Sequence, residues 1–244
     1  MQPPAGSRVF LSAEWRDLVM LNYEVDPALL IKYVPQGTEL DAFEGKTYIS
    51  LVGFRFLHTK MFGYLSIPLH TDFEELNLRF YVRRRDPCGD RRGVVFIREV
   101  VPKRAVAYVA RFVYGEKYVC RPMRHDVHVT PTGCAAEYQW RLGKRWCRLY
   151  ARASGSPAFP AGGSVEEFIT DHAWGYAAQP KGGCVEYYVS HQPWRVWTCS
   201  VAGFGGNADS LYGEALGAVL RRTPDSALIA EGSPVRVFSR QRIE

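Results

Sequence analysis

The sequence predicts a mainly β protein whose antiparallel strands form a sandwich or barrel, built as one domain over residues 1–244. Apolar and polar residues alternate through most segments, which is typical of half-buried strands. Turn signals recur every ~8–12 residues, the spacing found in sandwiches and barrels. Helical patterns are few, so two or three helices are expected at the periphery of the sheet.

The predicted strands are rich in β-branched and aromatic residues and are bounded by turn residues. They cover residues 48–57, 76–82, 94–101, 105–114, 136–142, 145–150, 185–191, 194–201 and 235–239. Short turns predict hairpins that join 94–101 to 105–114, 136–142 to 145–150, and 185–191 to 194–201.

Three segments carry helix signals. Asp26 followed by Pro27 predicts a short helix, with Asp as the cap and Pro in the first turn. Ser164 and Glu167 form a capping box that opens a second helix. Residues 209–222 give the longest pattern, with apolar residues on one side.

Composition bounds the class of protein. Hydrophobic residues make up 47% and charged residues 23%, which is typical of a folded globular chain. No apolar run approaches the ~18 residues of a membrane span, and residues 1–8 lack a signal pattern. A cytoplasmic protein without a membrane partner is therefore expected.

The net charge is +6, and only seven of the 31 basic residues are lysines. The densest basic cluster surrounds the turn at residues 86–90 and is interpreted as a solvated hairpin tip. Its members are Arg83, Arg84, Arg85, Arg91 and Arg92. A nucleic-acid patch is the alternative interpretation.

No metal or cofactor is predicted. The six cysteines are scattered without a Cys-x-x-Cys pair, which favours reduced thiols. Residues 203–208 match a dinucleotide fingerprint, but that motif needs a parallel βαβ unit and its neighbours here read as antiparallel hairpins.

One strand pattern points to a pocket. Glu75, Asn77, Arg79 and Tyr81 share one face of their strand, opposite an apolar face. On an outer sheet this would be a wet face, whereas in a barrel it would line a cavity with convergent polar groups.

Two further charges interrupt apolar strand faces. Glu99 shares its predicted face with Val95, Ile97 and Val101, and Arg111 lies on the strand predicted at 105–114. Because an unpaired buried charge is costly, we expect the two to pair with each other or with Glu75 and Arg79. Such a pair could be structural or functional.

Two aromatic candidates lie later in the chain. Tyr176 follows His172 and Trp174, and His191 ends a predicted strand. A lone histidine at such a place is usually a core residue, although His191 could be a pocket acid or base.

Several motifs together resemble the YqjF-like family of uncharacterised proteins, from about Phe10 to Val237. They are Phe10-Leu-Ser-Ala-Glu-Trp-Arg, Val34-Pro-Gln-Gly, Tyr48-Ile-Ser-Leu-Val-Gly-Phe, Phe73-Glu-Glu-Leu-Asn-Leu-Arg-Phe-Tyr-Val, His172-Ala-Trp-Gly-Tyr, His191-Gln-Pro-Trp and Glu231-Gly-Ser-Pro-Val. That family is similar in fold to acetoacetate decarboxylase. The resemblance implies a mainly antiparallel β barrel or cone with a central pocket.

The resemblance also implies site residues. The decarboxylase forms a Schiff base between a lysine and a keto acid, assisted by glutamates and an arginine. Glu75 matches the segment of one glutamate, and residues 111–118 resemble the lysine segment. There Lys117 stands near the family's Pro and Tyr118 near its lysine.

Three functional hypotheses remain open. In the first, the pocket binds a small carboxylate or carbonyl compound without a Schiff base. Its expected ligand contacts are Asn77, Arg79, Glu99, Arg111, Tyr114, Tyr118, Tyr176 and His191, with Glu75 beside them. In the second, a lyase uses Lys117 as the amine and Glu75 as the acid–base group. In the third, a basic barrel binds nucleic acid. A homo-oligomer is left open.

Overall fold

The computed structural model describes residues 3–4, 6–87, 89–180 and 182–243, and for Arg111 and Tyr114 it describes the backbone alone. Two sheets form the molecule. The larger sheet contains β1 (Val9–Val25), β2 (Glu39–Leu40), β3 (Thr47–Met61), β4 (Phe73–Arg84), β5 (Arg91–Val101), β6 (Tyr118–Cys120), β10 (Trp174–Ala178), β11 (Cys184–His191), β12 (Val196–Thr198), β14 (Ser226–Phe238) and β15 (Gln241–Ile243). The smaller sheet contains β7 (Met123–Thr130), β8 (Gly133–Leu142), β9 (Arg145–Ser154) and β13 (Val201–Gly205).

The larger sheet curls into a cone-like ring. Its strands run in the order β14-β1-β3-β4-β5-β10-β11, and β11 pairs again with β14. Most of these pairings are antiparallel, but β5 and β10 pair in parallel. The mainly β, cone-like architecture expected from the sequence is therefore confirmed.

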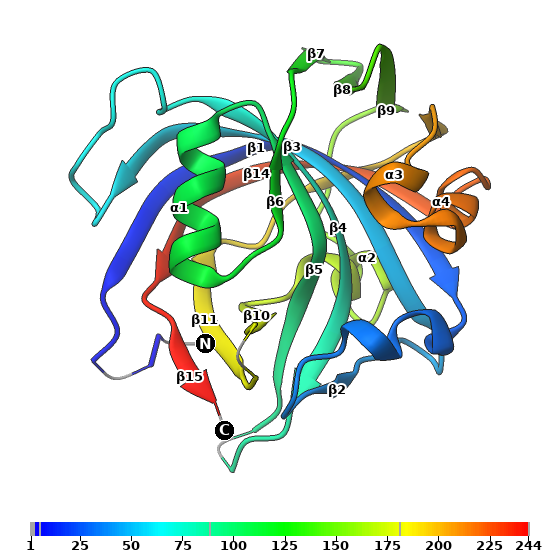
Figure 1. The fold of residues 1–244 in the computed structure, drawn as a ribbon. Coiled ribbons are helices and arrows are strands. Elements are labelled where there is room, and N and C mark those ends of the chain that lie inside the picture. The colour runs from blue at the N-terminus through cyan, green and yellow to red at the C-terminus, as the bar shows by residue number, and fades with distance from the viewer. Residues whose placement is uncertain (1–2, 5, 88, 181, 244) are drawn as a thin grey trace.

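The two faces of the ring bury different residues. Leu76, Leu78 and Phe80 of β4 point outward into a core that they share with Tyr138 and Trp140 of the smaller sheet. Helices α3 (Asp209–Tyr212) and α4 (Glu214–Leu220) add apolar residues to the same core. In Figure 1 both helices lie outside the ring.

The inner face is covered by two helices. Phe168 and Ile169 of α2 (Val165–Thr170) pack against it in a separate apolar cluster. Helix α1 (Arg104–Tyr114) crosses one side of the ring (Figure 1) and presents Val106 and Val109 to the interior. Between these helices the inner face encloses a cavity.

The strand predicted at residues 105–114 is wrong, because this segment is helix α1. Val106, Val109 and Ala110 follow helical spacing and line the interior, whereas Tyr108 and Phe112 are exposed. A short run of β-branched and aromatic residues fits both periods, so the pattern alone could not separate them. Glu99 and Arg111 are consequently not neighbours on paired strands.

The other helix predictions are confirmed in part. The Ser164 hydroxyl accepts a hydrogen bond from the Glu167 amide and caps α2. Asp26 caps a 3-10 turn, η1 (Pro27–Leu29), and a second 3-10 turn, η2 (Ile31–Tyr33), follows it. The long helix predicted at 209–222 is interrupted at Gly213, whose φ of 81° lies in the left-handed region.

Of the three predicted hairpins, only the one between residues 136–142 and 145–150 forms, as β8 and β9. The hairpin that included residues 105–114 is replaced by α1, and the one expected at residues 185–201 does not form. β11 pairs with β10, β14 and β15, whereas β12 pairs with β14. The first residues of the 203–208 motif belong to β13, which pairs antiparallel with β9, so the βαβ context of a dinucleotide site is absent at this strand.

The arginine cluster lies at the tip of the β4–β5 hairpin, and its members are bound by acidic side chains. Arg83 and Arg85 pair with Glu39, Arg84 and Arg91 pair with Glu186, and Arg92 pairs with Asp41. These ion pairs neutralise much of the positive charge that would attract nucleic acid. No helix in the described part of the chain is long and apolar enough to cross a membrane.

Candidate functional site

The cavity inside the ring measures about 180 Å³. Strands β1, β3, β4, β5, β10 and β11 contribute to its wall, together with α1 and the loop between α1 and β6. Most of the lining is apolar or aromatic, including Trp15, Phe56, Phe73 and Phe96. An apolar cavity with a few polar groups is the usual form of a small-molecule site.

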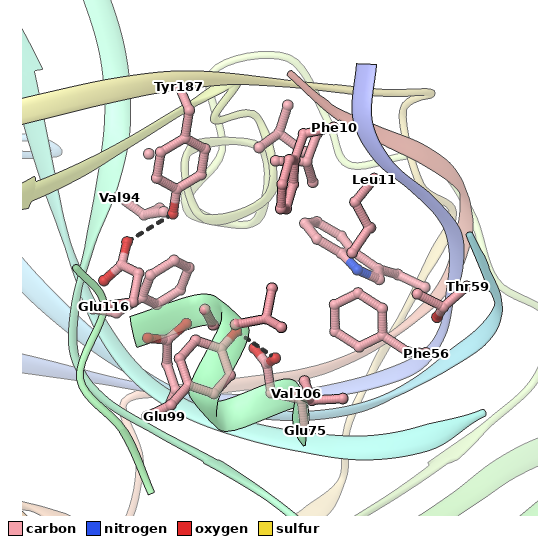
Figure 2. A pocket seen from close by; sticks show the side chains of 18 of the residues that line it. Phe10, Leu11, Phe56, Thr59, Glu75, Val94, Glu99, Val106, Glu116 and Tyr187 are labelled. Carbon is pink, nitrogen blue, oxygen red and sulfur yellow. Dashed lines mark hydrogen bonds between the residues drawn. The ribbon is translucent and has the colours of Figure 1, made fainter. Parts of the chain in front are cut away.

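Three glutamates lie on one wall of this cavity, and together we call them the carboxyl cluster: Glu75 on β4, Glu99 on β5, and Glu116 in the loop before β6. Figure 2 shows them side by side, facing Phe10 and Leu11 across the cavity. All three are buried, and Glu99 is only 1% exposed.

Hydroxyl and amide groups hold two members of the carboxyl cluster. The Tyr118 hydroxyl donates to Glu75 Oε2 at 2.8 Å, and the Asn77 amide donates to Glu75 Oε1 at 3.2 Å. The Tyr187 hydroxyl donates to Glu116 Oε1 at 2.9 Å (Figure 2). Glu99 Oε2 has no hydrogen-bond partner.

Burial governs the protonation of the carboxyl cluster. It raises the pKa of Glu75 from 4.5 to about 7, against the opposing hydrogen bonds from Tyr118 and Asn77. It also raises the pKa of Glu116 to about 8, and the neighbouring charge of Glu75 adds to this rise. Burial, then the charges of Glu116 and Glu75, raise the pKa of Glu99 well above its usual value. The cluster therefore carries bound protons at neutral pH.

A β-bulge turns Glu99 into the cavity. The register between β4 and β5 shifts after the pair Leu78 and Arg98, so that Arg79 lies opposite Phe96. Val95 and Ile97 consequently belong to the outer core, whereas Glu99 faces inward. The prediction that Glu99 shares a face with Val95 and Ile97 is wrong, because the extra residue of a bulge reverses the alternation.

Arg79 lies on a second part of the wall, which we call the arginine end. Its Nη2 donates to the carbonyl oxygen of Ile169 at 3.0 Å and lies 3.9 Å from Met20 Sδ. The guanidinium carbon lies 5.6 Å from the ring centre of Tyr81. Arg79 Nε is buried without a partner, and no described acidic side chain forms an ion pair with this guanidinium.

Two histidines accompany the arginine end. Burial lowers the pKa of His172 from 6.5 to about 4, and the nearby guanidinium of Arg79 adds to this lowering. Burial also lowers the pKa of His191, whose ring stacks on Trp194 with centres 4.4 Å apart. Both imidazoles are therefore neutral near pH 7, and Arg79 supplies the fixed positive charge.

The predicted site residues divide between the cavity and its surroundings. Glu75, Arg79, Glu99, Tyr118 and His191 line the cavity. Asn77 does not line it but donates a hydrogen bond to Glu75.

Other predicted contacts lie elsewhere. Tyr176 is buried in the outer core, where its hydroxyl donates to the carbonyl oxygen of Arg91. Arg111 and Tyr114 belong to α1, but their side chains fall outside the described part of the structure.

Lys117 does not line the cavity. Its side chain is exposed, and its Nζ lies 5.5 Å from the ring centre of Tyr33. Among the lining residues that the structure describes there is no lysine. The prediction that Lys117 has a pocket position is not met, because its neighbours Glu116 and Tyr118 point inward and the side chain between them is left exposed.

Sequence reasoning missed Glu116 and Tyr187. Glu116 lies in a loop, where no alternation marks which side chain points inward. Tyr187 shares a strand face with Val189 and His191, which could have identified it once β11 was assigned to the ring. Gly175 makes room for it, because a Cβ there would lie 2.2 Å from Tyr187 Cζ.

The donor set does not favour a metal. Among the residues described, no group of three His, Cys, Asp or Glu side chains could hold a metal ion together.

Solved structures with the same architecture include an acetoacetate decarboxylase, an acetoacetate decarboxylase-like enzyme and an enduracididine biosynthesis enzyme. Acetoacetate decarboxylase from Legionella pneumophila superposes with a TM-score of 0.66 at 14% identity, covering 100% of this chain and 90% of that one. The enduracididine biosynthesis enzyme MppR, complexed with pyruvate, gives 0.68 at 16% identity, covering 100% and 92%. An acetoacetate decarboxylase-like enzyme from Sphingomonas wittichii RW1 gives 0.67 at 14% identity, covering 96% and 93%. These TM-scores establish a shared fold, and at such low identities nothing beyond the fold follows.

Sequence comparison assigns the family. The uncharacterized protein YqjF of Bacillus subtilis (strain 168) is 33% identical over 75 residues, which make up 31% of this chain and 31% of that relative. A family model matches residues 12–234, nearly the whole chain. The chain therefore belongs to the DUF2071 family of uncharacterized conserved proteins, and it has the fold of acetoacetate decarboxylase-like enzymes.

Proposed function

We propose that the protein binds a small carboxylate compound in the cavity, with Arg79 contacting the carboxylate and without a Schiff-base lysine. The apolar lining then receives the rest of the ligand. One solved structure of the same fold, MppR, is complexed with pyruvate, which is itself a small carboxylate.

The observation that carries the proposal is the state of Arg79. Its side chain is buried, with 9% of the residue exposed, and no described carboxylate neutralises it. A buried charge without a counter-ion is costly, so an unpaired guanidinium in a cavity wall favours an anionic ligand. The planar fork of guanidinium donors matches a carboxylate.

The two alternative hypotheses gain no supporting contact. A lyase that uses Lys117 would need its amine in the cavity, whereas the side chain is exposed. A nucleic-acid-binding barrel would need free arginines at the β4–β5 tip, whereas those arginines are engaged in ion pairs.

Calorimetric titration with pyruvate, caproate and heptanoate tests the proposal. We expect Arg79→Gln to weaken carboxylate binding by about 10- to 100-fold, because it removes a charge-assisted hydrogen bond. Arg79→Lys, which keeps the charge but loses the fork, should bind with intermediate affinity. Arg124→Gln, an exposed arginine on β7, is the matched control and should change the Kd less than about twofold.

Two results would contradict the proposal: no carboxylate in the series binds the wild-type protein, or folded Arg79→Gln binds them as tightly as the wild type does.

A further inference from the structure

We propose that the ligand also carries a protonated amine, held by the carboxyl cluster, so that the cavity takes an ω-amino carboxylate. This inference rests on the proposed function and names the class of ligand. The carboxylate would lie at the arginine end, the ammonium at Glu75, Glu99 and Glu116, and a chain of methylene groups between them.

The carboxyl cluster is incomplete as it stands. Three carboxyl groups share one wall, but none forms an ion pair with a described side chain. Tyrosine hydroxyls and an amide satisfy oxygens of Glu75 and Glu116, whereas Oε2 of Glu99, a buried residue that lines the cavity, has no hydrogen-bond partner. Since an unmade buried hydrogen bond is costly, a donor from the ligand is the natural partner for this oxygen.

An ammonium group fits this wall better than a neutral donor does. It offers three hydrogen-bond donors and no acceptor, which matches a wall of carboxyl oxygens. Lys117, whose charge lowers the pKa of Glu99 and Glu116, has its own Nζ outside the cavity over Tyr33. Among the described side chains no ammonium group reaches the carboxyl cluster, so the ligand would supply one there.

The spacing of the two ends sets the length of the ligand. Glu75 and Arg79 are four residues apart on β4, so their Cα atoms are separated by about 13 Å. An α-amino acid carries both charges at one end and cannot reach both groups. The aromatic and aliphatic side chains of the lining suit a methylene spacer rather than a polar one.

The charge state of the cluster gives the inference a pH signature. An arriving ammonium stabilises the ionised carboxylates, so binding should release protons and strengthen as Glu75 and Glu116 ionise through about pH 7 and about pH 8. The described titratable groups set against the cluster are Tyr118, Tyr187 and Lys117. Arg111 and Tyr114 lie on the neighbouring helix α1, and their side chains are outside the part of the structure that is described.

Three matched pairs of ligands test the inference, each replacing an ammonium with a methyl group. They are γ-aminobutyrate with valerate, δ-aminovalerate with caproate, and ε-aminocaproate with heptanoate. In the pair of optimal length, the amino acid should bind at least about tenfold more tightly than its methyl partner. Norleucine, an isomer of ε-aminocaproate with the amine beside the carboxylate, should show no such gain.

A charge-neutral variant and a pH series locate the effect. Glu99→Gln should reduce the amine preference to about one, whereas Glu74→Gln, an acid that faces outward and contacts His125, should leave it in place. Glu116→Gln serves as a second variant if Glu99→Gln does not fold. In the wild-type protein the preference should increase from about pH 6 to about pH 8.5, with proton release measured in buffers of different ionisation enthalpy.

The outcomes separate the two proposals. If methyl partners bind as tightly as the amino acids and Arg79 is still required, the amine inference is wrong and the carboxylate proposal stands. If neither class binds, or binding ignores Arg79, the carboxylate proposal fails and the amine inference fails with it. A preference that persists in folded Glu99→Gln and Glu116→Gln also overturns the amine inference.

Discussion

The two faces of β4 differ although they belong to the same twelve residues. The outward side chains, such as Leu78 and Phe80, lie in a dry core sealed by the smaller sheet. The inward side chains include Glu75 and Arg79, which are also buried but face a cavity. Burial is thus common to both faces, and only the chemistry of the buried groups differs.

The outer face of the ring provides stability, and the inner face provides the proposed binding site. Apolar burial on the outer face contributes roughly 25 cal/mol per Å² and holds the ring in shape. The inner face keeps ionisable groups without counter-ions, which opposes folding. Buried ionisable groups without counter-ions on one face of a sheet, opposite a face packed with apolar residues, are typical of a binding site.

The largest effect is expected on the outer face. Leu78→Ala should lower the free energy of unfolding by about 2–5 kcal/mol, because a fully buried leucine leaves a void. Glu99→Leu on the inner face should lower it by less than about 1 kcal/mol or raise it, because an uncompensated buried acid is removed. Urea unfolding measures both, and equal losses at the two faces would contradict the comparison.

A substitution on β10 of the ring should have a smaller effect. Gly175→Ala places a Cβ against the Tyr187 ring, so Tyr187 must move away from Glu116. We expect a loss of about 1–3 kcal/mol in thermal unfolding. The pKa of Glu116 should increase further, since the Tyr187 hydrogen bond lowers it. Titration by NMR of the glutamate carboxyl carbons checks this shift, and an unchanged Glu116 pKa would contradict the assigned contact.

The inner face should also control how stability depends on pH. Glu75 and Glu116 bind protons more tightly when folded, so their contribution is complete below pH 4.5 and is lost as the pH passes about 7 and about 8. His172 acts oppositely, because its lowered pKa makes stability fall as the pH drops from 6.5 to about 4.

Above the range of His172, wild-type protein should therefore lose stability as the pH rises from about 6.5 to about 8, and the double variant Glu75→Gln with Glu116→Gln should lose less. Urea midpoints across this range give the comparison. A double variant that follows the wild-type profile would show that these carboxyls titrate normally.

The smallest effect is expected at Lys117. Lys117→Met should change the Kd for heptanoate less than about twofold, because the ammonium lies outside the cavity. Borohydride treatment with acetoacetate, followed by mass spectrometry, should leave Lys117 unmodified. A trapped adduct on this residue would revive Schiff-base chemistry.

The sequence predicts most of the β architecture but assigns helix α1 to a strand. Alternation identifies β3, β4, β8 and β9 because one face of each is apolar. Helix α1 is not recognised, because Ala and Val alternate with larger residues over a run too short to distinguish a helical from a strand period. β1 was not predicted, because polar residues such as Glu14, Arg16 and Asp17 interrupt its apolar pattern.

The site is predicted in part for equally physical reasons. Glu75 and Arg79 follow from alternation on a single strand, which requires no knowledge of tertiary structure. The inward orientation of Glu99 depends on the bulge in β5, and that of Glu116 depends on the path of a loop. Neither a bulge nor a loop leaves a periodic signal in the sequence. Lys117 and Tyr118 are adjacent in sequence, yet only the latter points inward.

The most direct test of the carboxylate site is a crystal structure with ε-bromocaproate, whose bromine can be located by anomalous scattering. We expect the carboxylate to accept hydrogen bonds from Arg79 and the bromine to lie inside the ring, toward Glu99. A ligand bound outside the ring, or one inside it whose carboxylate lies away from Arg79, would contradict the account.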